Sequence, residues 1–160
     1  MTELVVEFAD GTERLAMLAQ LLRRYVDEQG WTSEPSHVEE IETLPGEYGP
    51  PLGRAFLACQ SSESAVGCVV LRPIGRWCAE CVEMRRLYVI PEARRRGIGR
   101  RMVVASETWA REAGYERLRL VTMPHMIEAI SLYESLGFVV IEPDRPSTAS
   151  EAIFMDKPLS

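Results

Sequence analysis

Long apolar runs are missing from this 160-residue chain, although 46% of its residues are hydrophobic. No segment reaches the roughly 18 consecutive apolar residues of a membrane-spanning helix, so we expect no membrane partner. The acidic start, residues 1–4, lacks a basic stretch followed by an apolar one, and therefore no secretory signal is expected. These absences predict a cytoplasmic protein. The length fits a single domain over residues 1–160.

Residues for metal or redox chemistry are also few. Cys78 and Cys81 form a C-x-x-C pair, but Cys59 and Cys68 lie too far apart in sequence to supply the second close pair of a zinc site. We interpret the cysteines as reduced core residues and expect no metal, with zinc or redox chemistry as the alternative. A cysteine nucleophile at Cys81 would need a base beside it, and the chain has just two histidines.

Two common phosphate-binding motifs are excluded. The chain has no Gly-Lys pair for a P-loop, and Met102 stands where G-x-G-x-x-G requires its third glycine. An R-x-x-G-x-G pattern remains. Its glycines allow a tight turn, and the first N–H groups of a following helix would point at an anion. It predicts a diphosphate site, or else a solvated helix start, formed by Arg94, Arg95, Arg96, Gly97, Ile98, Gly99, Arg100 and Arg101.

Positive charge is concentrated in one segment of an acidic chain. The net charge is −6, from 18 Lys and Arg against 24 Asp and Glu. Seven arginines nevertheless lie between residues 85 and 101, with only Glu92 opposing them. This distribution indicates a local anion site. Nucleic-acid binding usually needs a broader basic face, so no nucleic-acid partner is expected.

Hydrophobic periodicity predicts a mixed α/β (α+β) chain. The segment from Glu80 to Thr122 is expected to form a strand, a helix and a parallel strand. Breaker residues between Leu44 and Gly53 predict an irregular loop, which either lines a substrate site or merely connects two elements. The expected strands span residues 4–8, 54–60, 65–71, 80–89, 115–122, 138–141 and 152–155, and the expected helices span 13–28, 36–42, 97–113 and 126–136.

Two linked motifs resemble those of the GNAT superfamily of N-acetyltransferases. Leu87-Tyr88-Val89-x-Pro91, followed by the R-x-x-G-x-G pattern, resembles its coenzyme A motif. Residues 129–138, with Tyr133 and Phe138, resemble its A-x-x-x-Y-x-x-x-G-F signature. The Leu-Pro-Gly-Glu-Tyr loop at 44–48 and the segment 83–89 are similar to a bacterial, small-molecule-type subgroup.

The resemblance implies a mostly antiparallel sheet of about seven strands with about four helices. Acetyl-CoA, as co-substrate, would be wedged where the parallel strands 83–89 and 117–122 splay apart. Backbone groups of Leu87 and Val89, flanking Tyr88, would pair with the pantetheine arm. N–H groups of residues 95–100 would hold the pyrophosphate. Met126 occupies the place where many relatives carry a coenzyme-binding Asn.

The implied activity is acetyl transfer to a primary amine of a small molecule, by direct attack in a ternary complex. An alkylammonium must first lose a proton, and Glu83 is the candidate base, with Glu80 and Glu47 as weaker ones. The Val89 N–H is the candidate oxyanion donor. Tyr133 is the candidate donor to the leaving thiolate. Glu83 could instead pair structurally with an arginine, and Tyr133 could be ordinary core.

Two other functions stay open at this stage. One is acetylation of a protein or peptide amine, and the other is a non-catalytic acetyl-CoA sensor. The acidic remainder of the chain would suit a cationic protein or a polyamine equally. No motif identifies the acceptor, and a homodimer is the base-rate expectation for the oligomeric state.

Overall fold

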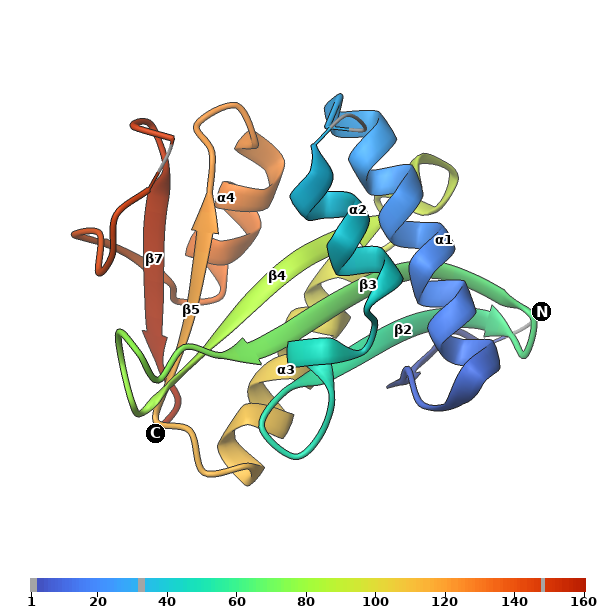
Figure 1. Cartoon of the computed structure of the whole chain (residues 1–160), viewed down its shortest axis with the longest axis horizontal. Helices are drawn as coiled ribbons and strands as arrows, with labels where there is room; N and C mark the ends of the chain where they lie inside the picture. Colours follow the sequence, from blue (N-terminus) through green and yellow to red (C-terminus); the bar gives the residue numbers. More distant parts are fainter. Residues whose placement is uncertain (1–2, 32–33, 148) are drawn as a thin grey trace.

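The computed structural model describes residues 3–31, 34–147 and 149–160; Met1 and Thr2 of the acidic start lie outside it. Within these ranges the chain forms one seven-stranded sheet, ordered β1-β2-β3-β4-β5-β7-β6. Neighbouring strands are antiparallel except for the parallel pair β4 and β5. The strands are β1 (Val5–Phe8), β2 (Arg54–Ser61), β3 (Ser64–Pro73), β4 (Cys81–Val89), β5 (Arg117–Thr122), β6 (Val139–Ile141) and β7 (Ile153–Pro158) (Figure 1).

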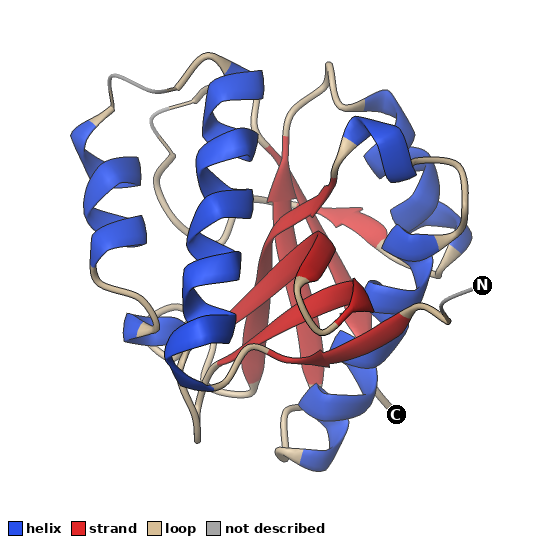
Figure 2. Cartoon of the chain, turned by 90° about the vertical axis from the view of Figure 1, so that its right-hand side faces the viewer, coloured by secondary structure: helices blue, strands red, loops and turns tan. Residues whose placement is uncertain are grey.

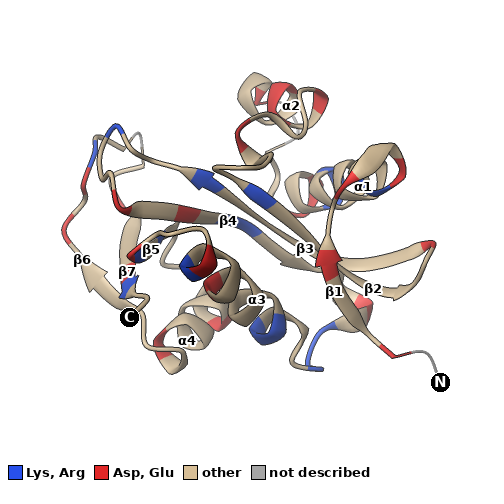
Figure 3. Ribbon diagram, turned by 90° about the horizontal axis from the view of Figure 1, so that it is seen from below, with Lys and Arg blue, Asp and Glu red and all other residues tan. Residues whose placement is uncertain are grey.

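Helices cover both faces of the sheet, which Figure 2 shows edge-on between two helical layers. Helices α1 (Gly11–Gln29) and α2 (Pro35–Glu42) lie on one face. Helices α3 (Ile98–Glu112) and α4 (Ile127–Ser135) lie on the other (Figure 3). Two short 3₁₀ turns, Gly46–Tyr48 and Pro91–Ala93, complete the elements. The predicted mixed, mostly antiparallel fold is confirmed.

Amphipathic helices divide the interior into two cores. On α1, the predicted periodicity turns Leu18, Leu22 and Tyr25 toward the sheet, and Gly30 ends the helix in a left-handed conformation. On α3, the predicted face buries Met102, together with Val103, Ser106 and Ala110. One core therefore lies under α1 and α2, and the other under α3 and α4.

The last strand is longer than its sequence indicates. The pattern predicts strand for 152–155, whereas β7 runs from Ile153 to Pro158. Charged Asp156 and Lys157 weaken the local strand signal. Pairing with β5 over the whole length, from Thr122↔Ile153 to Arg117↔Pro158, extends the strand. None of the described helices is long and apolar enough to cross a bilayer.

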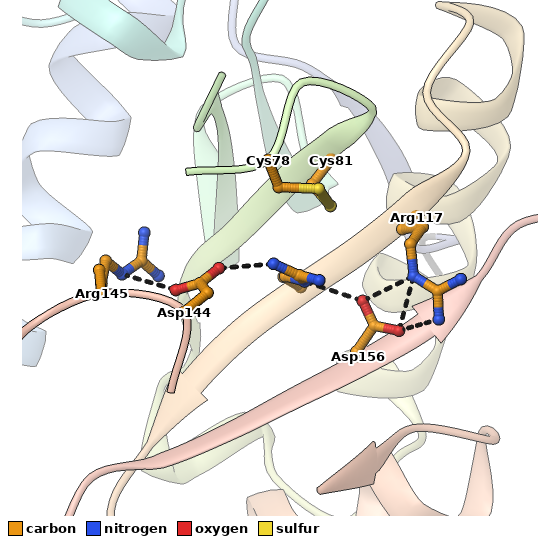
Figure 4. The surroundings of a disulfide bond; sticks show 7 residues. Cys78, Cys81, Arg117, Asp144, Arg145 and Asp156 are labelled. Carbon is orange, nitrogen blue, oxygen red and sulfur yellow. Dashed lines mark hydrogen bonds and ion pairs between the residues drawn. A yellow bond between two sulfur atoms is a disulfide. The ribbon is translucent and has the colours of Figure 1, made fainter. Parts of the chain in front are cut away.

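The expectation of reduced cysteines is half right. Cys59 and Cys68 are free and buried in adjacent strands. Cys78 and Cys81, however, are joined in a disulfide (Figure 4). The turn between β3 and β4 brings their Cα atoms to 5.3 Å, within the range that a disulfide requires. Cys81 therefore has no free thiol to act as a nucleophile.

Candidate functional site

The parallel strands β4 and β5 pair over three residues and then diverge. Their register ends at Glu83↔Arg119. The N–H of Ile90, just beyond β4, donates to Val66 O at 2.9 Å on β3. Because backbone groups alternate in direction along a strand, those of Leu87 and Val89 face away from β3, toward the opening. The backbone groups expected to bind the pantetheine arm therefore have no hydrogen-bond partner on a neighbouring strand within the described part of the chain.

A β-bulge interrupts β4 just before this opening. Val70 faces Arg85 and Cys68 faces Tyr88, so β4 carries one residue more than β3 over this interval. Arg86 has a left-handed backbone, with φ of 58°. Strand parity predicts alternate faces for Arg85 and Arg86, whereas the bulge turns both toward α2. Nothing in the local sequence pattern marks this bulge.

The amino end of α3 presents free backbone donors. Gly97, with φ of 74°, precedes the helix, and no side chain caps it. The first bond back into the helix runs from Arg101 N to Gly97 O, at 3.1 Å. The N–H groups of residues 98–100 therefore lack intrahelical acceptors and lie at the positive end of the helix dipole. This arrangement suits an anion, as the R-x-x-G-x-G pattern predicts.

Two adjoining cavities connect the helix start with the strand opening. One, of about 350 Å³, is bounded by β4, the 93–100 loop and α4. The other, of about 460 Å³, is bounded by β4 and by the carboxyl end of α1 and the start of α4. Both are lined by Leu87, Val89, Arg94, Glu128 and Ala129. Together they form an elongated region that runs along β4 to the start of α3.

The predicted arginines divide between cavity and outer surface. Arg94, Arg95 and Arg100 line the smaller cavity. Arg94 also pairs with Glu28 at 2.6 Å and donates to Val89 O at 2.9 Å, which fastens the loop to β4. Arg96 and Arg101 instead bond backbone oxygens of Glu92 and Leu4, at 3.5 and 3.1 Å. They fix neighbouring segments rather than line the cavities.

Tyr133 belongs to the core between α4 and the sheet. Its side chain is 7% exposed, and its ring lies 5.7 Å from that of Phe138. Burial, with a smaller contribution from Tyr25, raises the pKa of the Tyr133 hydroxyl far above its usual value. Tyr25 lines the larger cavity. The Tyr133 hydroxyl is thus protonated at neutral pH, and Tyr133 itself is not among the residues that line the two cavities.

Glu83 lies deep in the sheet among guanidinium groups. It is 2% exposed, and its carboxylate pairs with Arg72 at 3.0 Å and with Arg145. Arg85 approaches it at 3.6 Å. Sequence reasoning missed Arg72 and Arg145, because strand pairing and the β6–β7 connection bring them there from distant positions. Of the weaker candidate bases, Glu47 pairs with Arg72 at 3.2 Å, and Glu80 is exposed in the turn just before β4.

Met126 stands at the entrance to α4. It precedes the helix without capping it by a side-chain bond, and its Sδ accepts a contact from Thr122 Oγ1 at 3.7 Å. It also lines the larger cavity. This part of the cavity wall is therefore an apolar thioether.

The chain belongs to the acetyltransferase (GNAT) family, which matches residues 16–138. An uncharacterised N-acetyltransferase of Schizosaccharomyces pombe is 32% identical over 136 residues, which cover 84% of this chain and 82% of the relative. The IAA acetyltransferase of Azospirillum brasilense is 31% identical over 150 residues, 92% of each chain. The protein is therefore an acyltransferase enzyme that uses an acyl-CoA.

A solved structure supports the fold. The crystal structure of an aminoglycoside 6′-N-acetyltransferase complexed with coenzyme A matches with a TM-score of 0.73 at 19% sequence identity. The match covers 98% of this chain and 97% of the other.

Proposed function

We propose that this acetyltransferase transfers the acetyl group of acetyl-CoA to a primary amine of a small molecule, by direct attack in a ternary complex. The observation that carries the proposal is the opening between β4 and β5, which lies beside the uncapped start of α3. The diphosphate of the co-substrate would accept N–H bonds from residues 95–100, and its pantetheine arm would pair with Leu87 and Val89. An aminoglycoside 6′-N-acetyltransferase of similar fold is described as a complex with coenzyme A, which supports coenzyme A as the carrier group.

The acceptor amine must lose its proton before it attacks. Glu83 stays our candidate for the base. Its 2% exposure leaves no direct approach for a bulky amine, so we propose that the proton reaches it through a water molecule.

Two further groups complete the proposed chemistry. Acetyl-CoA supplies the activated thioester. The N–H of Val89, directed into the strand opening, would stabilise negative charge that develops on the carbonyl oxygen. Tyr133 would then donate its proton to the departing sulfur. The raised pKa keeps this hydroxyl protonated at neutral pH.

Two measurements test the proposal. Isothermal calorimetry should show binding of acetyl-CoA to the purified protein. A screen for coenzyme A release over amines, amino acids, aminoglycosides and peptides should identify at least one small-molecule acceptor. Failure to bind acetyl-CoA would contradict the whole proposal. Turnover with peptides alone would contradict the small-molecule assignment.

A further inference from the structure

A third cavity, of about 440 Å³, lies on the α2 side of the sheet. Its floor is formed by arginines of β3 and β4, which Figure 3 shows beneath α2. Its walls come from α2 and from the 3₁₀ turn Gly46–Tyr48. The breaker-rich loop predicted to line a substrate site thus does line a cavity. Arg86 on the floor directly precedes Leu87, which lines both cavities of the strand opening.

Buried positive charge exceeds buried negative charge around this floor. Three well-buried carboxylates, those of Glu40, Glu83 and Asp144, face four guanidinium groups of which the most exposed is 26% accessible. These groups belong to Arg72, Arg85, Arg86 and Arg145, and Asp144 is shared with a further arginine, Arg119. The Nη1 atom of Arg145, whose side chain is 8% exposed, is buried without a hydrogen-bond partner among the described residues.

The floor arginines keep unused donors. Arg85 Nη1 donates to the Tyr48 hydroxyl at 2.7 Å and to Glu40 at 3.2 Å. Arg86 contacts Glu40 through Nε and Nη2. Among the described residues, Arg85 Nη2 and Arg86 Nη1 have no partner. Burial, followed by the charges of Arg86 and Arg72, lowers the pKa of Arg85 despite the anions nearby, as expected where cations are crowded.

Carboxylates at the rim do not cancel this excess. Glu39 is exposed, and the Glu47 side chain is 62% exposed. Charges in contact with water are screened more strongly than buried ones. The buried guanidinium groups therefore dominate the field at the floor.

We propose that the acceptor carries a carboxylate beside its amine, and that Arg85 and Arg86 bind this carboxylate on the cavity floor. A planar guanidinium recognises a carboxylate through two parallel N–H bonds, and both residues have donors to spare. Arg86 directly precedes Leu87, so an anion held by the Arg86 guanidinium lies the length of one arginine side chain from the backbone that lines the strand opening. The amine of an acceptor bound there by its carboxylate can extend toward this opening. The inference rests on the proposed function and narrows its substrate class to amino carboxylates.

The net charge of the whole chain, −6, would by itself favour a cationic acceptor. The arginines of the cavity floor instead favour an acceptor with an anionic group. Long-range charge affects how often a ligand arrives, whereas buried donors decide which ligand is held. Polyamines and aminoglycosides have no anionic group, so they would leave the excess positive charge of the floor arginines uncompensated.

Matched substrates test the inference directly. Coenzyme A release should be measured with glycine, alanine, phenylalanine and glutamate, each beside its α-carboxamide, and with a polyamine. We expect kcat/KM to be at least tenfold higher for the carboxylate of at least one pair. Equal or faster turnover of the carboxamide in every pair, or turnover of the polyamine alone, would overturn the substrate class and leave acetyl transfer standing. No release with any amine would overturn both.

Two variants with opposite effects separate binding from folding. Arg85→Gln should raise KM for the carboxylate substrate at least tenfold and reduce the preference over its carboxamide, with the Kd of acetyl-CoA unchanged. Glu40→Gln removes the anion that competes for Arg85 and Arg86, and should lower KM for the same substrate. Arg24→Gln, which removes an exposed partner of Glu92, is the control. An unchanged carboxylate preference in both floor variants would refute the assignment.

Discussion

Arg119 on β5 lies directly opposite Asp156 on β7 and donates from Nε to Oδ1 at 3.0 Å. Arg119 also lies opposite Glu83 on β4, and Glu83 lies opposite Arg72 on β3. Charges therefore alternate across four neighbouring strands in one row. Asp144, from the β6–β7 connection, adds a further pair with Arg119 at 2.6 Å (Figure 4). The row joins the short final strands to the centre of the sheet.

Asp156→Asn should therefore destabilise the protein by about 3 kcal/mol at pH 7, because it leaves Arg117 and Arg119 without their shared anion. Burial alone would raise the pKa of Asp156, but hydrogen bonds from the two arginines lower it below its usual value. This contribution is therefore complete above about pH 4 and is lost as the pH falls through the folded-state pKa. Urea unfolding at pH 7 and pH 3 measures it.

The pair formed by Arg54 and the exposed carboxylate of Asp10 is the control. Asp10→Asn should cost less than about 1 kcal/mol. A similar loss of stability in both variants would mean that the buried row of charges contributes no more to the free energy of unfolding than the control pair does.

Tyr133→Phe should lower kcat by a factor on the order of 10², because the proton donor to the leaving sulfur is removed. The Kd of acetyl-CoA should stay within about twofold, since the ring and its contact with Phe138 remain. Stopped-flow assays with calorimetry separate the two quantities. Tyr115→Phe, which loses a bond to Leu52 O outside the cavities, should retain wild-type turnover. Wild-type turnover in Tyr133→Phe would remove that residue from the mechanism.

Glu83→Gln should abolish most turnover and flatten the rise of kcat/KM with pH, because the proposed base is lost. The variant also leaves three guanidinium groups less compensated, so its stability should fall as well. The pH profile, recorded below the unfolding temperature, distinguishes the two effects. Glu63→Gln in the exposed β2–β3 turn provides the comparison. A profile of unaltered shape would show that another group takes the proton.

Gly97→Ala should raise the Kd of acetyl-CoA by about tenfold, because a left-handed backbone costs an alanine about 1–2 kcal/mol. The added methyl group itself meets no atom within 4 Å, so the effect comes from conformation alone. Gly75→Ala, also in open space but without a positive φ, should bind normally. Equal Kd values for acetyl-CoA in the two variants would show that the backbone conformation of the turn before α3 does not determine this affinity.

Local pattern was enough to predict most of the fold. The apolar periodicities of α1 and α3 and the glycines that end helices are encoded within short segments. Two linked motifs then placed Leu87, Gly97 and Tyr133 in a common architecture. Boundaries differed chiefly at β7, where pairing with β5 outweighs local propensity.

The acceptor side could not be predicted in the same way. Arg72, Arg145 and Glu40 come from β3, the β6–β7 connection and α2, and they meet only after the sheet has formed. The disulfide was missed for a related reason, since C-x-x-C spacing fits reduced, metal-bound and oxidised pairs alike.

The bulge at Arg86 limits how acceptor preference can be redesigned. It allows two consecutive arginines to share one side of β4, which a regular strand forbids, and it immediately precedes the amides of Leu87 and Val89. Remodelling the strand here would shift the proposed coenzyme contacts together with the proposed acceptor contacts. New specificities should therefore be sought on α2 and in the Gly46–Tyr48 turn, which shape the same cavity and leave β4 intact.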